Sequence, residues 1–264
     1  MLLALDIGNT ETTVGLFVGE RLEDHWRLHT TAARTPDEWS SALTAYLTHA
    51  GHSTQEIRAA IVASVAPHVT QNLCDGIRGA TTREPIRVDA RSKLPIVLDV
   101  DEPLTVGADR IINTLAASRL FRRDTIVVDF GTATTFDCIT GEGRFIGGII
   151  MPGVRTAADD LVRQAAKLPA TELVPPARAI GRRTEDCIRA GVLWGAADAV
   201  DGLVRRIKAE WPAAGAGTGG GPHTVATGGL AGLVAPLCKE IEAVHPDLTL
   251  TGLRIAAQTL GLTW

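Results

Sequence analysis

Apolar residues along the chain gather in short runs that are typical of buried strands. Four of these runs read LLALDI from residue 2, AAIVASV from 59, IVVDF from 126 and TVATG from 224. Short apolar runs bounded by glycine or polar residues favour strands over helices. Because helical stretches lie between them, the pattern predicts an α/β fold.

Two stretches carry helical signatures. Residues 35–51 begin with Thr35 and Pro36, an N-cap followed by a first-turn proline, and close at Gly51. Apolar residues recur there at helical spacing, namely Trp39, Leu43, Tyr46 and Leu47. Residues 185–208 form the second predicted helix. Thr184 is its expected N-cap, with acidic residues in the first turn and basic residues in the last.

The helix over 185–208 has a predicted buried stripe and a row of small residues. The stripe comprises Ile188, Val192, Ala196, Val200, Leu203 and Ile207. The small residues Gly191, Gly195 and Ala199 would let another element approach closely. The segment after this helix, AAGAGTGGG over 213–221, is predicted to be a flexible loop because it offers almost no side chains to bury.

One pattern occurs twice, where an apolar strand ends in an aspartate and a glycine turn. Residues 3–10 read LALDIGNT and residues 126–135 read IVVDFGTATT. Asp129 takes the place of Asp6, Gly131 of Gly8 and Thr132 of Asn9. The repeat predicts two related lobes, 1–118 and 119–264.

Composition limits the classes of function. The chain has 264 residues, 45% of them hydrophobic, which is ample for two modest cores. A formal net charge of −4 gives no electrostatic case for nucleic acid or membrane binding. The four cysteines show no CxxC spacing, no apolar run approaches a membrane span, and the N-terminus does not resemble a signal peptide. We therefore expect a cytoplasmic protein with reduced thiols.

The repeated turn has a chemical interpretation. Glycine lets backbone amides approach an anion, and Asn9, Thr10 and Thr132 add short polar side chains. A carboxylate beside a phosphate is repulsive unless a cation lies between them, and magnesium nucleotides supply one. The alternative is that each aspartate merely satisfies a hairpin turn. The repetition favours the phosphate interpretation.

A third polar element is VGADR, residues 106–110, which precedes an apolar helix. Asp109 has the chemistry to accept a proton from an attacking hydroxyl, and Arg110 to hold a phosphate or carboxylate. The alternative is that Asp109 caps the helix and Arg110 is solvated. On this stretch alone the residues favour that alternative.

Two glycine-rich turns remain, GGIIMPGV at 147–154 and ATGGLAGL at 226–233. The first can shape only a pocket or an interface, and the second can pack against a base or ribose, although either can be purely structural. The chain has no Walker loop, zinc spacing or GxSxG elbow. Asp137 and the acidic cluster Asp99, Asp101 and Glu102 are predicted to be solvated or turn residues.

Together these motifs resemble a known family. DIGNT (6–10), GADR (107–110), DFGTATT (129–135), GGIIMPG (147–153) and ATGG (226–229) occur in this order in type III pantothenate kinases. The family belongs to the acetate and sugar kinase/Hsc70/actin superfamily. The resemblance implies two related ribonuclease H-like lobes with mixed sheets flanked by helices. It also implies transfer of the ATP γ-phosphoryl group to pantothenate, which gives 4'-phosphopantothenate in the first step of coenzyme A synthesis.

The resemblance assigns roles by position. Asp109 corresponds to the general base, and Asp129 to the ligand of a monovalent cation, K⁺ or NH₄⁺. Asp6 would help to place the Mg²⁺ of the nucleotide. The implied ATP contacts are Asp6, Ile7, Gly8, Asn9, Thr10, Glu11, Thr12, Thr13 and Thr132. The implied pantothenate contacts are Gly107, Ala108, Asp109, Arg110 and Thr184.

Family members are homodimers whose active site lies at or near the interface, so helix 185–208 is a candidate interface element. One departure is Val100, which stands where many members carry tyrosine, with Glu102 where asparagine or aspartate is usual. Two alternatives to the kinase remain. One is a transcriptional accessory factor of the same family without kinase activity, and the other is a kinase for another small hydroxyl compound.

Overall fold

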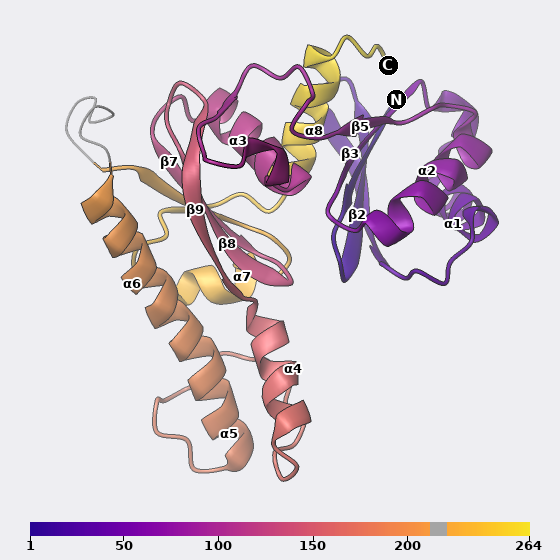
Figure 1. The fold of residues 1–264 in the computed structure, drawn as a ribbon. Coiled ribbons are helices and arrows are strands. Elements are labelled where there is room, and N and C mark those ends of the chain that lie inside the picture. Colours follow the sequence, from indigo (N-terminus) through magenta and orange to yellow (C-terminus); the bar gives the residue numbers. More distant parts are fainter. Residues whose placement is uncertain (212–220) are drawn as a thin grey trace. The chain divides into compact units, whose positions relative to one another are not determined.

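The computed structural model describes residues 1–211 and 221–264, and these divide into two compact units (Figure 1). Unit 1 comprises residues 1–116 and 248–264, and unit 2 comprises residues 117–247. The expected division at 118/119 lies close to the first of these boundaries. It differs for residues 248–264, which pack into the core of unit 1 through Leu250 and Leu253.

Unit 1 is built on a five-stranded sheet in the order β3-β2-β1-β4-β5. Strand β1 pairs antiparallel with β2 and parallel with β4. The elements of unit 1 are β1 (Leu2–Ile7), β2 (Glu11–Val18), β3 (Arg21–His29), α1 (Pro36–His49), η1 (Thr54–Glu56), β4 (Ala59–Ser64), α2 (Pro67–Thr81), β5 (Ile86–Val88), β6 (Val97–Leu98), η2 (Pro103–Thr105), the start of α3 (Ala108–Leu120) and α8 (Leu248–Thr259).

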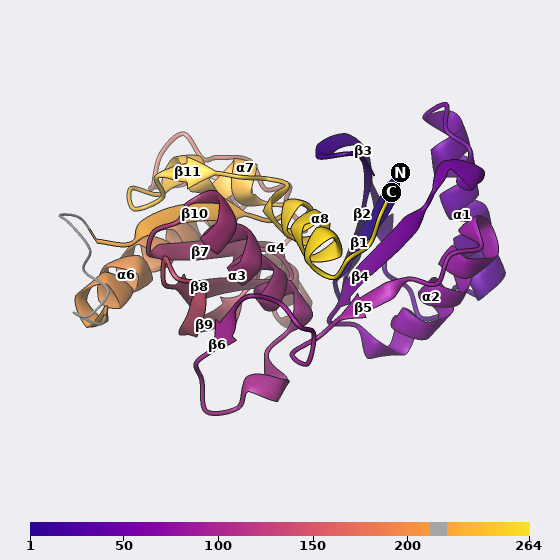
Figure 2. The same ribbon diagram turned by 90° about the horizontal axis from the view of Figure 1, so that it is seen from above.

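Both faces of the unit 1 sheet are covered, which explains why β1 is a continuous apolar run. Helices α1 and α2 cover one face, where Trp39 and Leu73 join the core. Helices α3 and α8 supply Ile112 and Leu253 to the core on the other face. Figure 2 shows α1 and α2 on one side of β1 and β4. Because both faces are covered, unit 1 can present polar groups at the end of the sheet where its strands terminate.

Helix α1 confirms the start predicted from the sequence. The hydroxyl of Thr35 accepts a hydrogen bond from the amide of Glu38, and the carboxylate of Glu38 accepts one from the amide of Thr35. This reciprocal pair satisfies two amides that a helix start leaves open. Tyr46 is exposed and lies beside the ring of Trp26, with centroids 5.9 Å apart, so it does not join the buried stripe.

Unit 2 repeats the local arrangement around its first strand. Strand β7 pairs antiparallel with β8 and parallel with β10, as β1 does with β2 and β4. Its strands follow the order β11-β10-β7-β8-β9. The elements are β7 (Thr125–Phe130), β8 (Ala133–Ile139), β9 (Arg144–Pro152), α4 (Val154–Gln164), α5 (Thr184–Arg189), η3 (Ala190–Trp194), α6 (Gly195–Glu210), β10 (His223–Thr227), α7 (Ala231–Val234), η5 (Ala235–Leu237) and β11 (Ala243–Val244). The predicted α/β fold of two related lobes is confirmed.

The predicted helix 185–208 is interrupted by a π-helical turn over Ala190–Trp194. Its N-cap is Arg183, not Thr184, and this residue makes no side-chain capping bond. A π turn holds one more residue than an α turn, so the side chains after it rotate around the axis. The buried side chains beyond position 190 accordingly include Leu193, Ala197 and Val204. Of the predicted stripe, Ile188, Val200 and Ile207 are buried as expected. The other members, Val192, Ala196 and Leu203, are half-buried.

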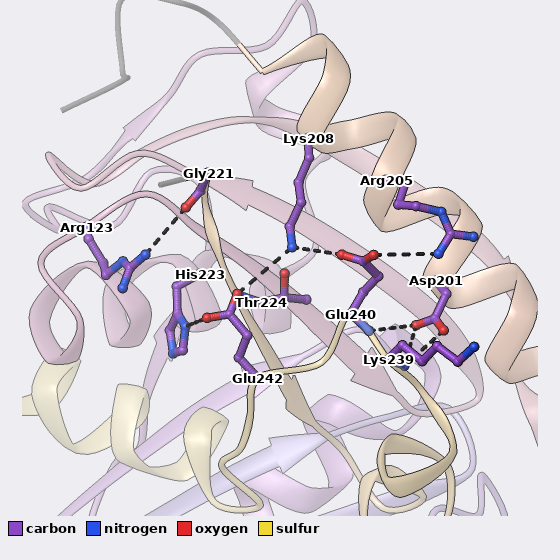
Figure 3. A network of polar contacts seen from close by, with 10 residues as sticks. All are labelled: Arg123, Asp201, Arg205, Lys208, Gly221, His223, Thr224, Lys239, Glu240 and Glu242. Carbon is purple, nitrogen blue, oxygen red and sulfur yellow. Dashed lines mark hydrogen bonds and ion pairs between the residues drawn. The ribbon is translucent and has the colours of Figure 1, made fainter. Parts of the chain in front are cut away.

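A polar network joins the last turns of α6 to the beginning of β10 (Figure 3). Lys208 Nζ lies 2.9 Å from Glu240 Oε2, and Glu242 Oε2 lies 2.9 Å from His223 Nδ1. The other oxygen of Glu242 accepts a hydrogen bond of 3.1 Å from the amide of Thr224. Glu242 thus holds His223 and Thr224, the first two residues of β10. Of the predicted loop 213–221, only Gly221 is among the described residues.

Candidate active site

The turn between β1 and β2 has a geometry that only glycine fits. The amide of Gly8 donates to the carbonyl oxygen of Glu11 at 3.0 Å, and a Cβ at Gly8 would lie 2.8 Å from that oxygen. This tight closure leaves Asn9 and Thr10 exposed at the tip, next to the half-buried Asp6 at the end of β1. Unit 1 thus presents a carboxylate, an amide and a hydroxyl together.

The neighbouring positions on β2 are held by contacts within unit 1. Thr12 is buried, and its hydroxyl lies 2.9 Å from the hydroxyl of Thr30. Glu11 is exposed and pairs with Arg27. These side chains brace the hairpin, whereas Asn9 and Thr10 project from it.

Asp109 lies near the same edge of the sheet. It is the second residue of α3, and a Cβ at Gly107 would meet its Oδ1 at 2.5 Å and Cγ1 of Val65 at 3.3 Å. Val65 directly follows β4, and its amide donates to the carbonyl of Ile7 at 3.0 Å. The fold therefore brings the Asp109 carboxylate to the ends of β1 and β4, beside the residues 6–10.

The environment of Asp109 changes its acidity. Burial raises the pKa of the Asp109 carboxyl, and the hydrogen bond of 2.8 Å that Oδ1 accepts from the amide of Arg110 opposes this only in part. Asp109 is the second residue of α3, and its carboxylate accepts a hydrogen bond from a first-turn amide, so it takes part in capping the helix as the structural alternative predicts. A carboxyl with a raised pKa is a better proton acceptor than an ordinary aspartate.

The second aspartate turn, between β7 and β8, is one residue shorter than the first. Phe130 pairs with Thr134, whereas Ile7 pairs with Thr12, so three residues replace four. The amide of Gly131 donates to the carbonyl of Ala133 at 3.0 Å. The two turns are therefore related in position and differ in detail.

Both later glycine motifs pack against this second turn. A Cβ at Gly228 would overlap Oδ1 of Asp129, and the amide of Leu230 donates to the carbonyl of Phe130 at 3.2 Å. A Cβ at Gly153 would overlap the carbonyl oxygen of Thr132, which accepts a hydrogen bond of 3.1 Å from the Gly153 amide. Unit 2 thus gathers three motifs around Asp129.

Thr184 lies apart from this group, at the first turn of α5. It lines an apolar pocket of about 600 Å³ between α4 and the helix that runs through α5 and α6. Leu161, Ile188 and Val192 also line the pocket, as do Gly191 and Gly195. A Cβ at either glycine would meet no described atom within 4 Å. The close approach predicted at these glycines is not made by any element of the described chain.

Asp137 corrects one expectation from the sequence. It was predicted to be solvated, but it is completely buried in β8. Its partner in register is Val127, two residues before Asp129, so its side chain lies on the same face of the sheet as Asp129. Burial of an aspartate in a strand depends on what packs over that face, and the sequence carries no local signal for it.

The donor atoms around both aspartates fit hard cations. Asp6 and Asp129 offer carboxylate oxygens, and the adjoining turns offer carbonyl, amide and hydroxyl oxygens, which suit magnesium and alkali ions. Among residues 1–211 and 221–264, no three His, Cys, Asp or Glu side chains gather into a metal site.

Within the part of the chain that the structure describes, no helix is both long and apolar enough to cross a membrane.

Comparisons with known proteins agree with these motifs. The family model for type III pantothenate kinase matches residues 2–206. The chain is 42% identical over 255 residues to the type III pantothenate kinase of Moorella thermoacetica, covering 97% of this chain and 98% of that protein.

Solved structures show the same fold at low identity. A Baf family transcriptional activator from Campylobacter jejuni superposes with a TM-score of 0.59 at 18% identity, over 97% of this chain and 98% of that one. The activator of 2-hydroxyisocaproyl-CoA dehydratase from Clostridium difficile, with bound ADPNP, gives a TM-score of 0.58 at 16% identity. The match covers 98% of this chain and 93% of that one. At these identities the likeness concerns the fold alone.

Proposed function

The chain belongs to the type III pantothenate kinase family, and from this premise we propose how its residues phosphorylate pantothenate with ATP in the first step of coenzyme A synthesis. The observation that carries the proposal is the position of Asp109 beside the residues 6–10 at one edge of the unit 1 sheet. A base and a phosphate-binding turn are the minimum that phosphoryl transfer to an alcohol requires. We place this activity in the cytoplasm.

Asp109 is the general base in this proposal. Its carboxylate accepts the proton of the primary hydroxyl of pantothenate as that oxygen attacks the γ-phosphorus. The bond between the γ-phosphorus and the β,γ-bridging oxygen breaks, and ADP leaves with the electron pair. The raised pKa of Asp109 supports this role. The proposed pantothenate contacts are Gly107, Ala108, Asp109, Arg110 and Thr184. Val100, which stands where many family members carry tyrosine, cannot offer pantothenate the hydroxyl group of that tyrosine.

The turn at residues 6–13 holds the nucleotide in this proposal. A kinase of this family uses ATP, typically with a divalent metal ion. Asp6 would hold Mg²⁺ directly or through its waters, and the exposed Asn9 and Thr10 would contact phosphate oxygens. A metal ion held there would supply neutralisation of the phosphate charge, and the turn orients the phosphates relative to Asp109.

Asp129 is proposed to hold a monovalent cation, K⁺ or NH₄⁺, and Thr132 to contact ATP. The packing of Gly228 against the Asp129 carboxylate supports this, because it fixes the carboxylate beside the turn. The cation would lessen the negative charge that the nucleotide meets near Asp129.

The function is tested by release of ADP in a coupled assay with pantothenate, Mg²⁺-ATP and K⁺. Turnover that depends on pantothenate is expected. Its absence under these conditions would leave the accessory factor or a different hydroxyl substrate as the better explanation.

Replacement of Asp129 tests the cation. We expect Asp129→Ala to raise the K⁺ concentration for half-maximal activity about tenfold or more, because it removes the charged ligand. Asp198→Ala, at an exposed acid of α6, is the matched control and should leave the K⁺ response unchanged. An unaltered K⁺ response in Asp129→Ala would refute the assignment.

We also propose a homodimer that uses the apolar face around the pocket between α4 and α6. The pocket is lined almost entirely by apolar groups and by two glycines with open space above them. Such a surface is more typical of an interface than of a solvated face.

Replacement of Gly195 tests this interface. We expect Gly195→Glu to raise the dimer dissociation constant about 100-fold, because the new carboxylate would be buried without a partner. Light scattering on a size-exclusion column measures the change. Gly232→Glu, at an open and exposed glycine in α7, is the control and should remain dimeric. A dimeric Gly195→Glu variant would exclude this face.

A further inference from the structure

Thr227, the last residue of β10, has a buried hydroxyl that the proposed chemistry does not use. The residue is 1% exposed, and its Oγ1 has no hydrogen-bond partner among residues 1–211 and 221–264. A buried hydroxyl without a partner destabilises a folded protein, so a bound ligand that satisfies it would gain affinity.

The register of the sheet places this hydroxyl on the same face as Asp129. Thr227 pairs with Asp129 in the parallel ladder of β10 and β7, and paired residues of neighbouring strands point to one face. The residues one position earlier, Ala226 and Val128, both belong to the core on the opposite face. Gly228 follows Thr227 and packs against the Asp129 carboxylate. The hydroxyl and the carboxylate are thus neighbours at the end of the sheet.

Two other threonines of unit 2 show that burial alone does not make a ligand. The hydroxyls of Thr224 and Thr134 are also buried and have no partner in the described part of the chain. Thr224 pairs with Ile126 and Thr134 with Phe130, so both side chains lie on the face that carries the core. Only the hydroxyl of Thr227, of these three, shares the face of Asp129.

We propose that Thr227 Oγ1 is a second protein ligand of the monovalent cation, beside Asp129. The inference rests on the proposed role of Asp129. A phosphate is a poor occupant for this place because the carboxylate would repel it. A hydroxyl oxygen has two lone pairs, so it can replace a water of an alkali cation while its hydrogen is donated to a neighbouring oxygen.

Thermal unfolding of four proteins tests the proposal without measuring turnover. Wild type, Thr227→Val, Thr227→Ser and Thr224→Val are each unfolded with Mg²⁺ and a non-hydrolysable ATP analogue. KCl is titrated against choline chloride at constant ionic strength, and the rise of Tm with K⁺ gives an apparent Kd. Valine keeps the shape of threonine and removes the hydroxyl, whereas serine keeps the hydroxyl.

We expect Thr227→Val to weaken K⁺ binding about tenfold, while Thr227→Ser and Thr224→Val respond like wild type. Both valine variants should keep or gain Tm in choline chloride, because each loses an unsatisfied hydroxyl. If Thr227→Val keeps the wild-type K⁺ response, Thr227 is not a ligand, and the role of Asp129 stands. If wild type itself shows no K⁺ response, the cation role of Asp129 falls and the inference with it.

Discussion

Asp109→Asn is expected to lower kcat by a factor of about 10² to 10⁴, the range that general base catalysis contributes. The amide cannot accept the hydroxyl proton, yet it has nearly the shape of the carboxylate. The Asp109 side chain packs against Gly107 and accepts a hydrogen bond from the amide of Arg110. Asparagine keeps an oxygen for this bond, so it should preserve the local packing. Steady-state kinetics with pantothenate measures the loss, and the KM for ATP should change little.

The pH dependence gives an independent readout of the same group. A carboxylate is a base only when ionised, and burial raises the pKa of Asp109. In wild type, kcat/KM should be at its maximum above the pKa of Asp109 and should fall as the pH decreases through that pKa. Because the pKa is raised, this fall should occur at a higher pH than it would for an ordinary aspartate. The matched control is Asp101→Asn, at an exposed acid of the same segment. Full activity of Asp109→Asn would end the base assignment and leave the family membership untouched.

Gly228→Ala is expected to have the second largest effect, with loss of K⁺-dependent activity and destabilisation by about 2–4 kcal/mol. Gly228 has φ +92°, and an added Cβ would overlap Asp129 Oδ1 and lie 2.7 Å from the amide nitrogen of Phe130. Neither the carboxylate nor the strand can yield without disturbing the turn that follows Asp129.

A matched glycine separates backbone strain from close packing. Gly147 in β9 has φ +116°, but nothing described lies within 4 Å of a Cβ there. Gly147→Ala should therefore show only the cost of an unfavourable backbone conformation, about 1–3 kcal/mol, and keep its response to K⁺. Chemical denaturation and the K⁺ titration compare the two variants. Equal effects would mean that the contact with Asp129 is unimportant.

Much of the architecture follows from local features of the sequence. Strands β1 and β4 are apolar because helices cover both faces of the unit 1 sheet, and strands β7 and β10 are apolar because they contribute to the core of unit 2. The start of α1 is encoded by Thr35 and Glu38, which interact within one turn. Motifs that occur in a fixed order also identified the family, and the family model confirms that identification.

Other features depend on which distant segments of the chain pack side by side. The spacing of residues along the sequence does not predict this. The contact of Gly228 with Asp129 requires β10 to lie parallel beside β7, although about 95 residues separate them in the chain. The burial of Asp137 and of the Thr227 hydroxyl follows from the same pairing. The π turn at 190–194 was missed because the residues around it have ordinary helical character.

That π turn also sets where the chain can change in length. Because it holds one residue more than an α turn in nearly the same rotation, removal of one exposed residue from 190–194 would restore α-helical hydrogen bonding and leave the buried face of α6 turned as before. Removal of a residue from an ordinary α turn of α6 would instead rotate everything beyond it by about 100°, which would take Val204 out of the core and Lys208 away from Glu240. The π turn is therefore the part of this helix that can lose one residue with the least change in packing.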